Sequence, residues 1–235
     1  SPLTRRTKMK RILLLLSSYA VAMALLEAAV VVYMRRLYYP DNPLELFPLH
    51  FLNNYDPLLE LSREAATMIM ILTVALLAER RSLTRSFAAF VFVFGVWDLF
   101  YYFWLKVLMD WPMSWLEWDV LFLIPSVWLG PWICPAMISL LFIVWGFWTL
   151  RSTNNIAFSP SSLSVFVIGA GLGLITFLQP AVAVLMEGGI AELSRYTPRG
   201  FWWWLFFLSY VIMACGLGMT LRSAGNDRSS GRRAA

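Results

Sequence analysis

Residues 86–135 read SFAAFVFVFGVWDLFYYFWLKVLMDWPMSWLEWDVLFLIPSVWLGPWICP, and this stretch decides the fold. An apolar helical pattern from Ser86 to Leu108 carries one acid, Asp98, in its middle, and a segment rich in tryptophan and acidic residues follows it. An ionisable side chain inside a membrane-spanning helix costs roughly 2.5–3.5 kcal/mol on insertion scales, so it generally has a partner or a function. The stretch therefore predicts a membrane helix that holds a polar group in its interior.

The composition of the whole chain also indicates a membrane protein. The 235 residues are 60% hydrophobic and 14% charged, whereas soluble domains are about 25% charged. Several apolar stretches are long enough to cross a hydrocarbon core of about 30 Å. We expect an all-α, polytopic integral membrane protein with six transmembrane helices, at residues 12–34, 57–78, 86–108, 131–150, 160–186 and 198–221.

These spans leave no room for a separate soluble domain, so residues 1–222 are expected to form one transmembrane domain. The apolar stretch of the first span is too long for a signal peptide, and we interpret it as a retained helix. Residues 223–235 are rich in Gly, Ser and Arg without an apolar pattern. This composition predicts a disordered basic tail.

Local signals mark where helices begin. A capping residue followed by proline, a typical helix start, precedes three spans: Asp56-Pro57, Ser159-Pro160 and Thr197-Pro198. The sequence Ser114-x-x-Glu117 matches a capping box and predicts a short helix between the third and fourth spans. Because tryptophan favours the headgroup level, we expect residues 35–56 and 110–130 to form interfacial caps on the outer side.

Small residues predict two close helix contacts. The first span carries Ala20-x-x-x-Ala24-x-x-x-Ala28, and the fifth carries Gly169-x-Gly171-x-Gly173. Small side chains at such spacing allow the backbones of neighbouring helices to approach.

The distribution of charge predicts the orientation. Lys and Arg concentrate in the N-terminal segment, between the second and third spans, and in the C-terminal tail. Since positively charged loops remain in the cytoplasm, both termini are expected inside, and the short loops favour a bacterial inner membrane. The net charge is +5, and the basic residues cluster next to the apolar spans. This placement does not suggest a groove for phosphates, so the expected partner is the lipid bilayer and not nucleic acid.

Polar side chains from several spans are expected at one depth near the outer side. The second span presents Glu60, Arg63, Glu64 and Thr67 at i, i+3, i+4 and i+7, which places them on one stripe of a helix. We expect a pocket here, reached from outside and covered by the two interfacial caps. The candidate ligand-binding residues are Glu27, Arg63, Glu64, Asp98, Tyr101, Tyr102, Asp119 and Gln179.

Structural roles for the same residues stay open. Arg63 and its neighbouring glutamates could form a local charge group at a helix end. Asp98 could bond to an adjacent tyrosine, or pair with Arg63 or Lys106. Glu27 has no basic residue within one helical turn, so we expect an inter-helix pair or a functional role. The decisive expectation is that Glu27, Glu64 and Asp98 surround a shared cavity.

The residue inventory excludes several chemistries. With one histidine, His50, the chain cannot supply a bis-histidine haem site or a three-histidine zinc site. The sequence contains no G-x-S-x-G, P-loop, H-E-x-x-H or C-x-x-C motif. Catalytic residues and cofactors therefore stay unknown, and no metal site is predicted, because Arg63 already neutralises part of the acidic charge.

Three functions remain open. The first is a pocket that binds or transports a small molecule or a lipid headgroup. In outline, six helices, an outward pocket and small residues on the first helix resemble the substrate-binding membrane subunits of energy-coupling-factor vitamin transporters. That resemblance implies a partner that carries an ATPase, since this chain has no phosphate-binding loop.

The other two functions use the same acids differently. In a non-catalytic subunit of a larger membrane complex, the acids would pair across an interface with partner membrane subunits. In a lipid-modifying enzyme, Glu27, Glu64 or Asp98 would act as a general base or a metal ligand.

Overall fold

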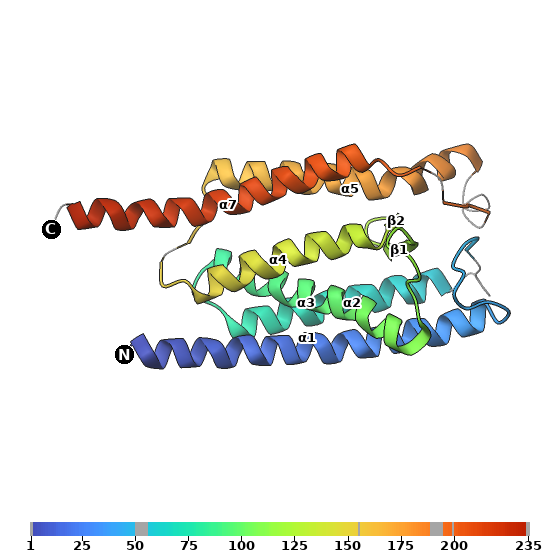
Figure 1. Ribbon diagram of the computed structural model, residues 1–235, viewed down its shortest axis with the longest axis horizontal. Coiled ribbons are helices and arrows are strands. Elements are labelled where there is room, and N and C mark those ends of the chain that lie inside the picture. The colour runs from blue at the N-terminus through green and yellow to red at the C-terminus, as the bar shows by residue number, and fades with distance from the viewer. Residues whose placement is uncertain (1, 50–55, 155, 189–194, 199, 234–235) are drawn as a thin grey trace.

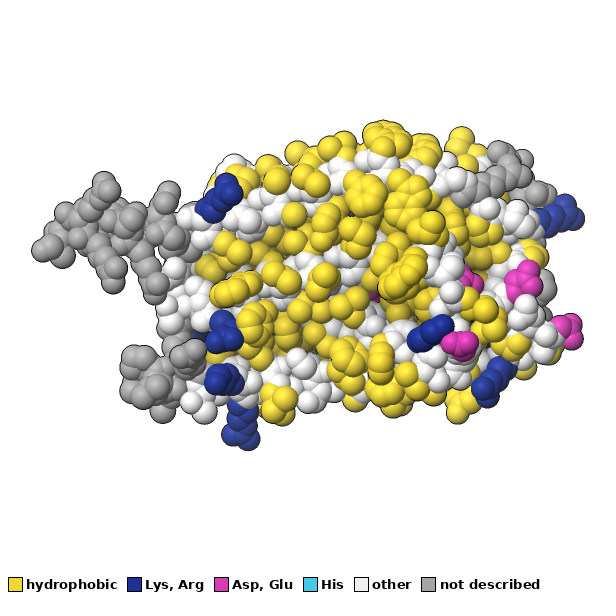
Figure 2. Space-filling model, in the orientation of Figure 1, with side chains coloured by type: hydrophobic (Ala, Val, Ile, Leu, Met, Phe, Trp, Pro, Cys, Tyr) yellow, Lys and Arg dark blue, Asp and Glu magenta, His cyan; other side chains and the backbone are white. Residues whose placement is uncertain are grey.

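The computed structural model describes residues 2–49, 56–154, 156–188, 195–198 and 200–233. Each of the helices found there contains a stretch long and apolar enough to cross a membrane, so the chain is a multi-pass membrane protein. Hydrophobic side chains cover the middle of the face shown in Figure 2, and charged ones gather toward its two ends. The helices are α1 (Pro2–Tyr38), α2 (Asp56–Ala78), α3 (Leu83–Met109), α4 (Ile133–Arg151), α5 (Pro160–Gly188) and α7 (Trp203–Arg233).

The helices run side by side along the long axis of the molecule (Figure 1). Both termini lie at one end, which we call the termini end. A two-stranded antiparallel sheet, β1 (Trp118–Phe122) and β2 (Trp128–Pro131), lies toward the opposite end. We call this opposite end the hairpin end.

The sequence predicts six spans, and the described residues contain six helices able to span a membrane, with differences at their ends. The predicted start of the sixth at Pro198 is wrong, because the helix begins at Trp203. Phe201, just before it, packs edge-on against Trp118 and beside Phe177, which holds the preceding segment outside the helix. At its other end α7 continues to Arg233, through the predicted disordered tail, because extending an existing helix costs far less than starting one.

The predicted short helix after α3 is a β-hairpin instead. The Glu117 carboxylate accepts hydrogen bonds from the backbone N–H groups of Met113 (2.6 Å) and Ser114 (3.1 Å). The bond between the Glu117 side chain and the Ser114 backbone is one of the two bonds of the expected capping box. Here it stabilises a turn, and no helix follows directly. The chain then pairs as a strand, with Trp118 opposite Pro131 and Asp119 opposite Gly130. The expectation of purely helical interfacial loops is therefore wrong for this connection.

Helix α3 lies at the centre of the bundle, and small residues bring its neighbours close. Ala20, Ala24 and Ala28 of α1 are completely buried, as their spacing predicts. Trp104 of α3 donates a hydrogen bond from its indole nitrogen to the carbonyl oxygen of Val21 in α1 (3.1 Å). On the other side, a Cβ atom added to Gly95 would lie 2.6 Å from the carbonyl oxygen of Ser139 in α4.

Helices α5 and α7 form a separate tight pair. A Cβ atom on Gly169 would lie 2.5 Å from the backbone nitrogen of Met213, so only glycine permits this approach. Gly171 faces open space, which makes the predicted glycine run only partly an interface. The pair contacts the rest of the protein through aromatic packing, for example the stacked rings of Trp128 and Phe177, and through a hydrogen bond from the indole nitrogen of Trp145 in α4 to the hydroxyl of Thr220 (3.0 Å).

A buried arginine fastens the termini end. Arg85 donates to the Glu79 carboxylate (2.9 Å) and to the carbonyl oxygens of Thr149 (3.0 Å) and Leu150 (2.7 Å). The last carbonyl groups of a helix have no partner within the helix, and here one side chain from α3 satisfies those of α4. Burial alone would raise the pKa of Glu79, but the hydrogen bonds from Arg85 and from the backbone of Arg81 lower it.

Candidate functional site

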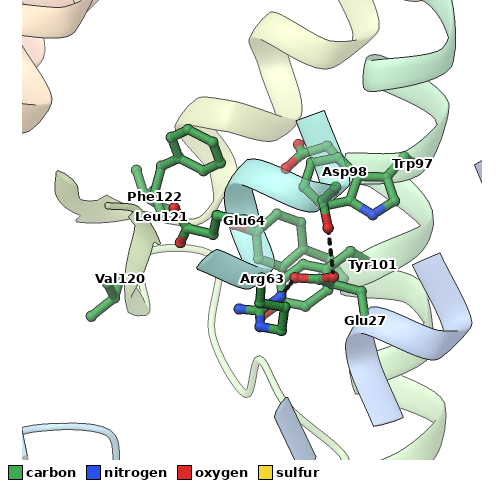
Figure 3. Close-up of a pocket in the computed structure, with 11 residues that line it drawn as sticks. Glu27, Arg63, Glu64, Trp97, Asp98, Tyr101, Val120, Leu121 and Phe122 are labelled. Atoms are coloured by element: carbon green, nitrogen blue, oxygen red, sulfur yellow. Dashed lines mark hydrogen bonds and ion pairs between the residues drawn. The ribbon is translucent and has the colours of Figure 1, made fainter. Parts of the chain in front are cut away.

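A polar cavity of about 40 Å³ lies between α1, α2, α3 and the hairpin. Figure 3 shows Glu27, Arg63, Glu64 and Asp98 arranged around it. A space of this size has room for only a few water molecules or one small chemical group. Its lining comprises Glu27, Arg63, Glu64, Thr67, Trp97, Asp98, Tyr101, Tyr102, Val120, Leu121 and Phe122.

Arg63 joins α2 to α1 across this cavity. Its guanidinium forms ion pairs with Glu27 of α1 and with Glu60 one turn earlier in α2. The hydroxyl of Thr67 also donates to the Glu27 carboxylate (3.4 Å). The stripe on α2 thus supplies both partners of Glu27, so the inter-helix pair expected for Glu27 is present.

The other two acids of the cavity form no ion pair among the described residues. Glu64 accepts a hydrogen bond from the backbone N–H of Leu123 in the hairpin connection (2.8 Å). Asp98 accepts one from the hydroxyl of Ser139 in α4 (2.9 Å). Both side chains are buried, at 8% and 9% exposure, so each carboxylate lies in the interior with a neutral donor only.

A larger cavity of about 330 Å³ adjoins the polar one at the hairpin end. The two share four lining residues, Arg63, Glu64, Tyr101 and Val120. The rest of the large cavity is mostly apolar and is covered from both interfacial connections. Those covering side chains are Leu46, Leu49, Val120, Leu123 and Val127.

A second ion pair borders the apolar cavity. Arg35 at the end of α1 donates to Asp119 of β1 (3.2 Å), and both side chains are 4% exposed. The guanidinium also lies over the ring of Trp111, 4.0 Å from its centroid, a favourable cation–π contact. Burial raises the pKa of Asp119 to about 6, although Arg35 opposes this shift.

Acidic groups outnumber basic groups around the two cavities. The described lining contains two guanidinium groups, Arg35 and Arg63. It contains five carboxyl groups, which are Glu27, Glu60, Glu64, Asp98 and Asp119. The described residues contain no group of three or more His, Cys, Asp or Glu placed to hold a metal ion.

Most of the predicted site residues meet at these cavities. Glu27, Glu64 and Asp98 line one cavity, as expected, together with Arg63, Tyr101 and Tyr102. Asp119 lines the adjoining cavity, whereas Gln179 lines neither. Depth along α5 was the only basis for including Gln179, and depth does not fix the direction of a side chain. That any of these residues bind a ligand stays a prediction.

Lys106 and two residues that sequence reasoning missed have contacts that differ from the expectations. Lys106 does not pair with Asp98, because its ammonium group pairs with Asp110 (2.7 Å). His50 lies outside the described residues. Sequence reasoning missed Arg35 and Ser139, since a helix-end arginine and a lone span serine carry no local sign of a distant acidic partner.

Comparison of the chain with protein-family models, with curated proteins and with solved structures finds no match. The resemblance to the vitamin-transporter subunits therefore rests on the expected architecture alone, and no sequence motif supports it.

Proposed function

We propose that this chain is a membrane-embedded binding protein for a small amphipathic molecule. The apolar body of the ligand occupies the large cavity, and its polar head lies toward Arg63, Glu64 and the polar cavity. In the orientation that the charge distribution predicts, the hairpin end faces the outside of a bacterial inner membrane. The observation that carries the proposal is the adjacency of an apolar and a polar cavity with four shared lining residues.

The dimensions support this division of the ligand. Pockets for small molecules generally measure about 300–1,000 Å³ and combine apolar walls with a few polar groups that orient the ligand. The large cavity, at about 330 Å³, is within this range. The polar cavity is too small for a whole ligand, so it suits a head group or the water molecules around one.

The placement of the acids favours this function over a structural subunit. A subunit that pairs its acids with partner helices presents them on its outer surface. Here Glu27 and Asp119 pair within the chain, and Glu64 and Asp98 face an internal cavity. Charged groups turned inward are typical of a ligand pathway or a binding site in a membrane protein.

Filling the large cavity tests the proposal. Val31 lines the cavity from α1 and is buried, whereas its neighbour Val30 is 38% exposed and does not line it. We expect Val31→Phe to occupy ligand space, and Val30→Phe to serve as a control of equal size on the same helix. The measurement is mass spectrometry of the small molecules that remain bound after purification in mild detergent.

The expected result is one amphipathic compound that co-purifies with the wild-type protein and with Val30→Phe, and at least tenfold less of it with Val31→Phe. Thermal unfolding of the three proteins without ligand establishes that each is folded. Equal retention by both variants, or no retained compound on the wild-type protein, would contradict a ligand site in this cavity.

A further inference from the structure

Two buried carboxylates of the candidate site, Glu64 and Asp98, form no ion pair among the described residues. Arg63 is already engaged by Glu27 and Glu60, and Arg35 by Asp119. Glu64 accepts a hydrogen bond from a backbone N–H and Asp98 accepts one from a hydroxyl group. The charge of Arg63 also acts on Glu64, but two other carboxylates share it. A buried carboxylate without a compensating positive charge is costly, and both of these line the polar cavity.

Aromatic side chains surround the same space. Trp97, Tyr101, Tyr102 and Phe122 line the polar cavity, and the rings of Tyr101 and Tyr102 lie edge to face with centroids 5.1 Å apart. Electron-rich ring faces next to carboxylates are the chemistry that proteins use to bind ammonium groups.

One polar atom of this lining also has no partner. The indole nitrogen of Trp97 makes no hydrogen bond among the described residues, and the side chain is 92% buried, being 8% exposed. A buried donor without an acceptor is destabilising. An ammonium group has no acceptor, so a water molecule in the same polar cavity is needed beside the head group to accept from Trp97.

We infer that the head group of the ligand is a primary ammonium, which Glu64 and Asp98 balance electrostatically inside the aromatic polar cavity. This inference rests on the proposed function and names its ligand class, an amphipathic alkylamine. An ammonium group is close to a water molecule in size and suits a cavity of about 40 Å³. An anionic head would add to the excess of carboxylates.

The experiment uses three probes of equal chain length: n-hexylamine, 1-hexanol and hexanoate. Each is titrated into the full-length protein in detergent at about pH 8, where an alkylamine is cationic as the lysine side chain is. Isothermal calorimetry and the thermal unfolding midpoint report binding. We expect hexylamine to bind at least ~10-fold more tightly than hexanol, and hexanoate to bind more weakly than hexanol.

Two charge-neutralising variants locate the counter-charges. Glu64→Gln and Asp98→Asn keep the side-chain shape and are each expected to weaken hexylamine binding ~30-fold or more, because losing one partner of a buried charge pair costs at least about 2 kcal/mol. Binding of hexanol should change less than threefold. The matched control is Asp41→Asn, an exposed acid in the connection after α1, which should leave all three affinities unchanged.

Several results would overturn the inference. If hexanol or hexanoate binds as tightly as hexylamine, the head group is not an ammonium, while the proposed amphipathic site stands. Equal stabilisation by ammonium chloride alone would identify a site for a small free cation and not for an amphipathic amine. If none of the three probes binds the wild-type protein, both this inference and the proposed function fail. The comparison of probes on the wild-type protein needs no variant, so misfolding of a variant cannot obscure it.

Discussion

Two regions of this bundle differ in the charged residues that they contain. Helices α1 to α3 and the hairpin enclose five carboxyl and two guanidinium groups around their cavities. The spans of α5 (residues 160–186) and α7 (residues 203–221) contain no charged residue at all. The buried hydroxyl groups of Thr176, Ser209 and Thr220 donate to carbonyl oxygens of their own helix, as Thr176 does to Leu172 (2.9 Å).

The difference shows where each half obtains its stability. The backbones of α5 and α7 approach each other closely at glycine residues. Dispersion between the packed atoms is then enough to hold the two helices together. Around α1 to α3 the packing leaves cavities, and the groups at their edges depend on ion pairs and hydrogen bonds between elements. The polar cavity and the larger apolar cavity both lie at the second kind of region.

Removal of Arg35 should have the largest effect. Arg35→Met leaves Asp119 buried without its partner, and we expect a loss of about 3–5 kcal/mol in the free energy of unfolding. The measurement is titration with SDS in mild detergent micelles, followed by circular dichroism. The double variant Arg35→Met/Asp119→Leu should recover most of this loss. A single variant as stable as the wild type would show that the pair contributes nothing to that half.

A side chain at Gly169 should disturb the other half by about 3 kcal/mol. Gly169→Val forces its Cβ atom against the backbone of Met213, and overpacking of this kind costs about 1–3 kcal/mol, most where backbone must move. Gly171→Val, two residues along and facing open space, is the control and should stay within about 0.5 kcal/mol. Equal effects in the same SDS titration would mean that close backbone approach does not hold α5 to α7.

Asp119 should give the first half a distinctive dependence on pH. Its pKa is raised to about 6 in the folded state, so between about pH 4 and 6 the folded chain keeps a proton that the unfolded chain has released. The contribution of this group to the free energy of unfolding therefore falls by about 3 kcal/mol as the pH rises through that window.

The check is unfolding at several pH values for the wild type and Asp119→Asn. The difference between the two curves should slope downward from about pH 4 to 6 and then become flat. Glu79 has a lowered pKa, so its own contribution to stability rises with pH. That contribution is the same in the wild type and in Asp119→Asn, and it cancels in the difference curve. A difference curve without slope would contradict the raised pKa.

The smallest expected effect concerns a single hydroxyl group. Thr67→Val removes a donor to Glu27 without changing shape, and should cost about 1 kcal/mol. Thr73 of the same helix is exposed, and its hydroxyl bonds to the carbonyl of Ile69 (2.7 Å). Thr73→Val should therefore change the unfolding free energy by less than about 0.5 kcal/mol, and an equal loss in both variants would indicate a general effect of threonine removal.

The parts of this protein that sequence predicts are those that local pattern determines. Span length and hydropathy identify six helices, and the i, i+3, i+4, i+7 spacing places Arg63, Glu64 and Thr67 on one face of α2. The prediction of a shared cavity for three acids succeeded because buried carboxylates on adjacent helices have few stable places other than a polar interior.

The parts that sequence did not predict depend on contacts between distant segments. The hydrogen bonds near Ser114 and Glu117 are local and were anticipated in part, but pairing of Trp118 with Pro131 across the hairpin prevents a helix. Arg35 and Arg36 are indistinguishable by local composition, and only Asp119, which lies 84 residues further along the chain, distinguishes them.

The bonds of Arg85 to the end of α4 and to Glu79 have a mechanical consequence. One buried side chain, Arg85, joins α3, α4 and the connection after α2. We therefore expect these segments to keep their relative positions at the termini end. At the hairpin end, the backbone N–H of Leu123 bonds to Glu64 of α2, and Asp119 of β1 pairs with Arg35 of α1. Movement of the hairpin away from the cavities therefore requires both of these contacts to open, whereas the contacts of Arg85 at the opposite end can stay in place.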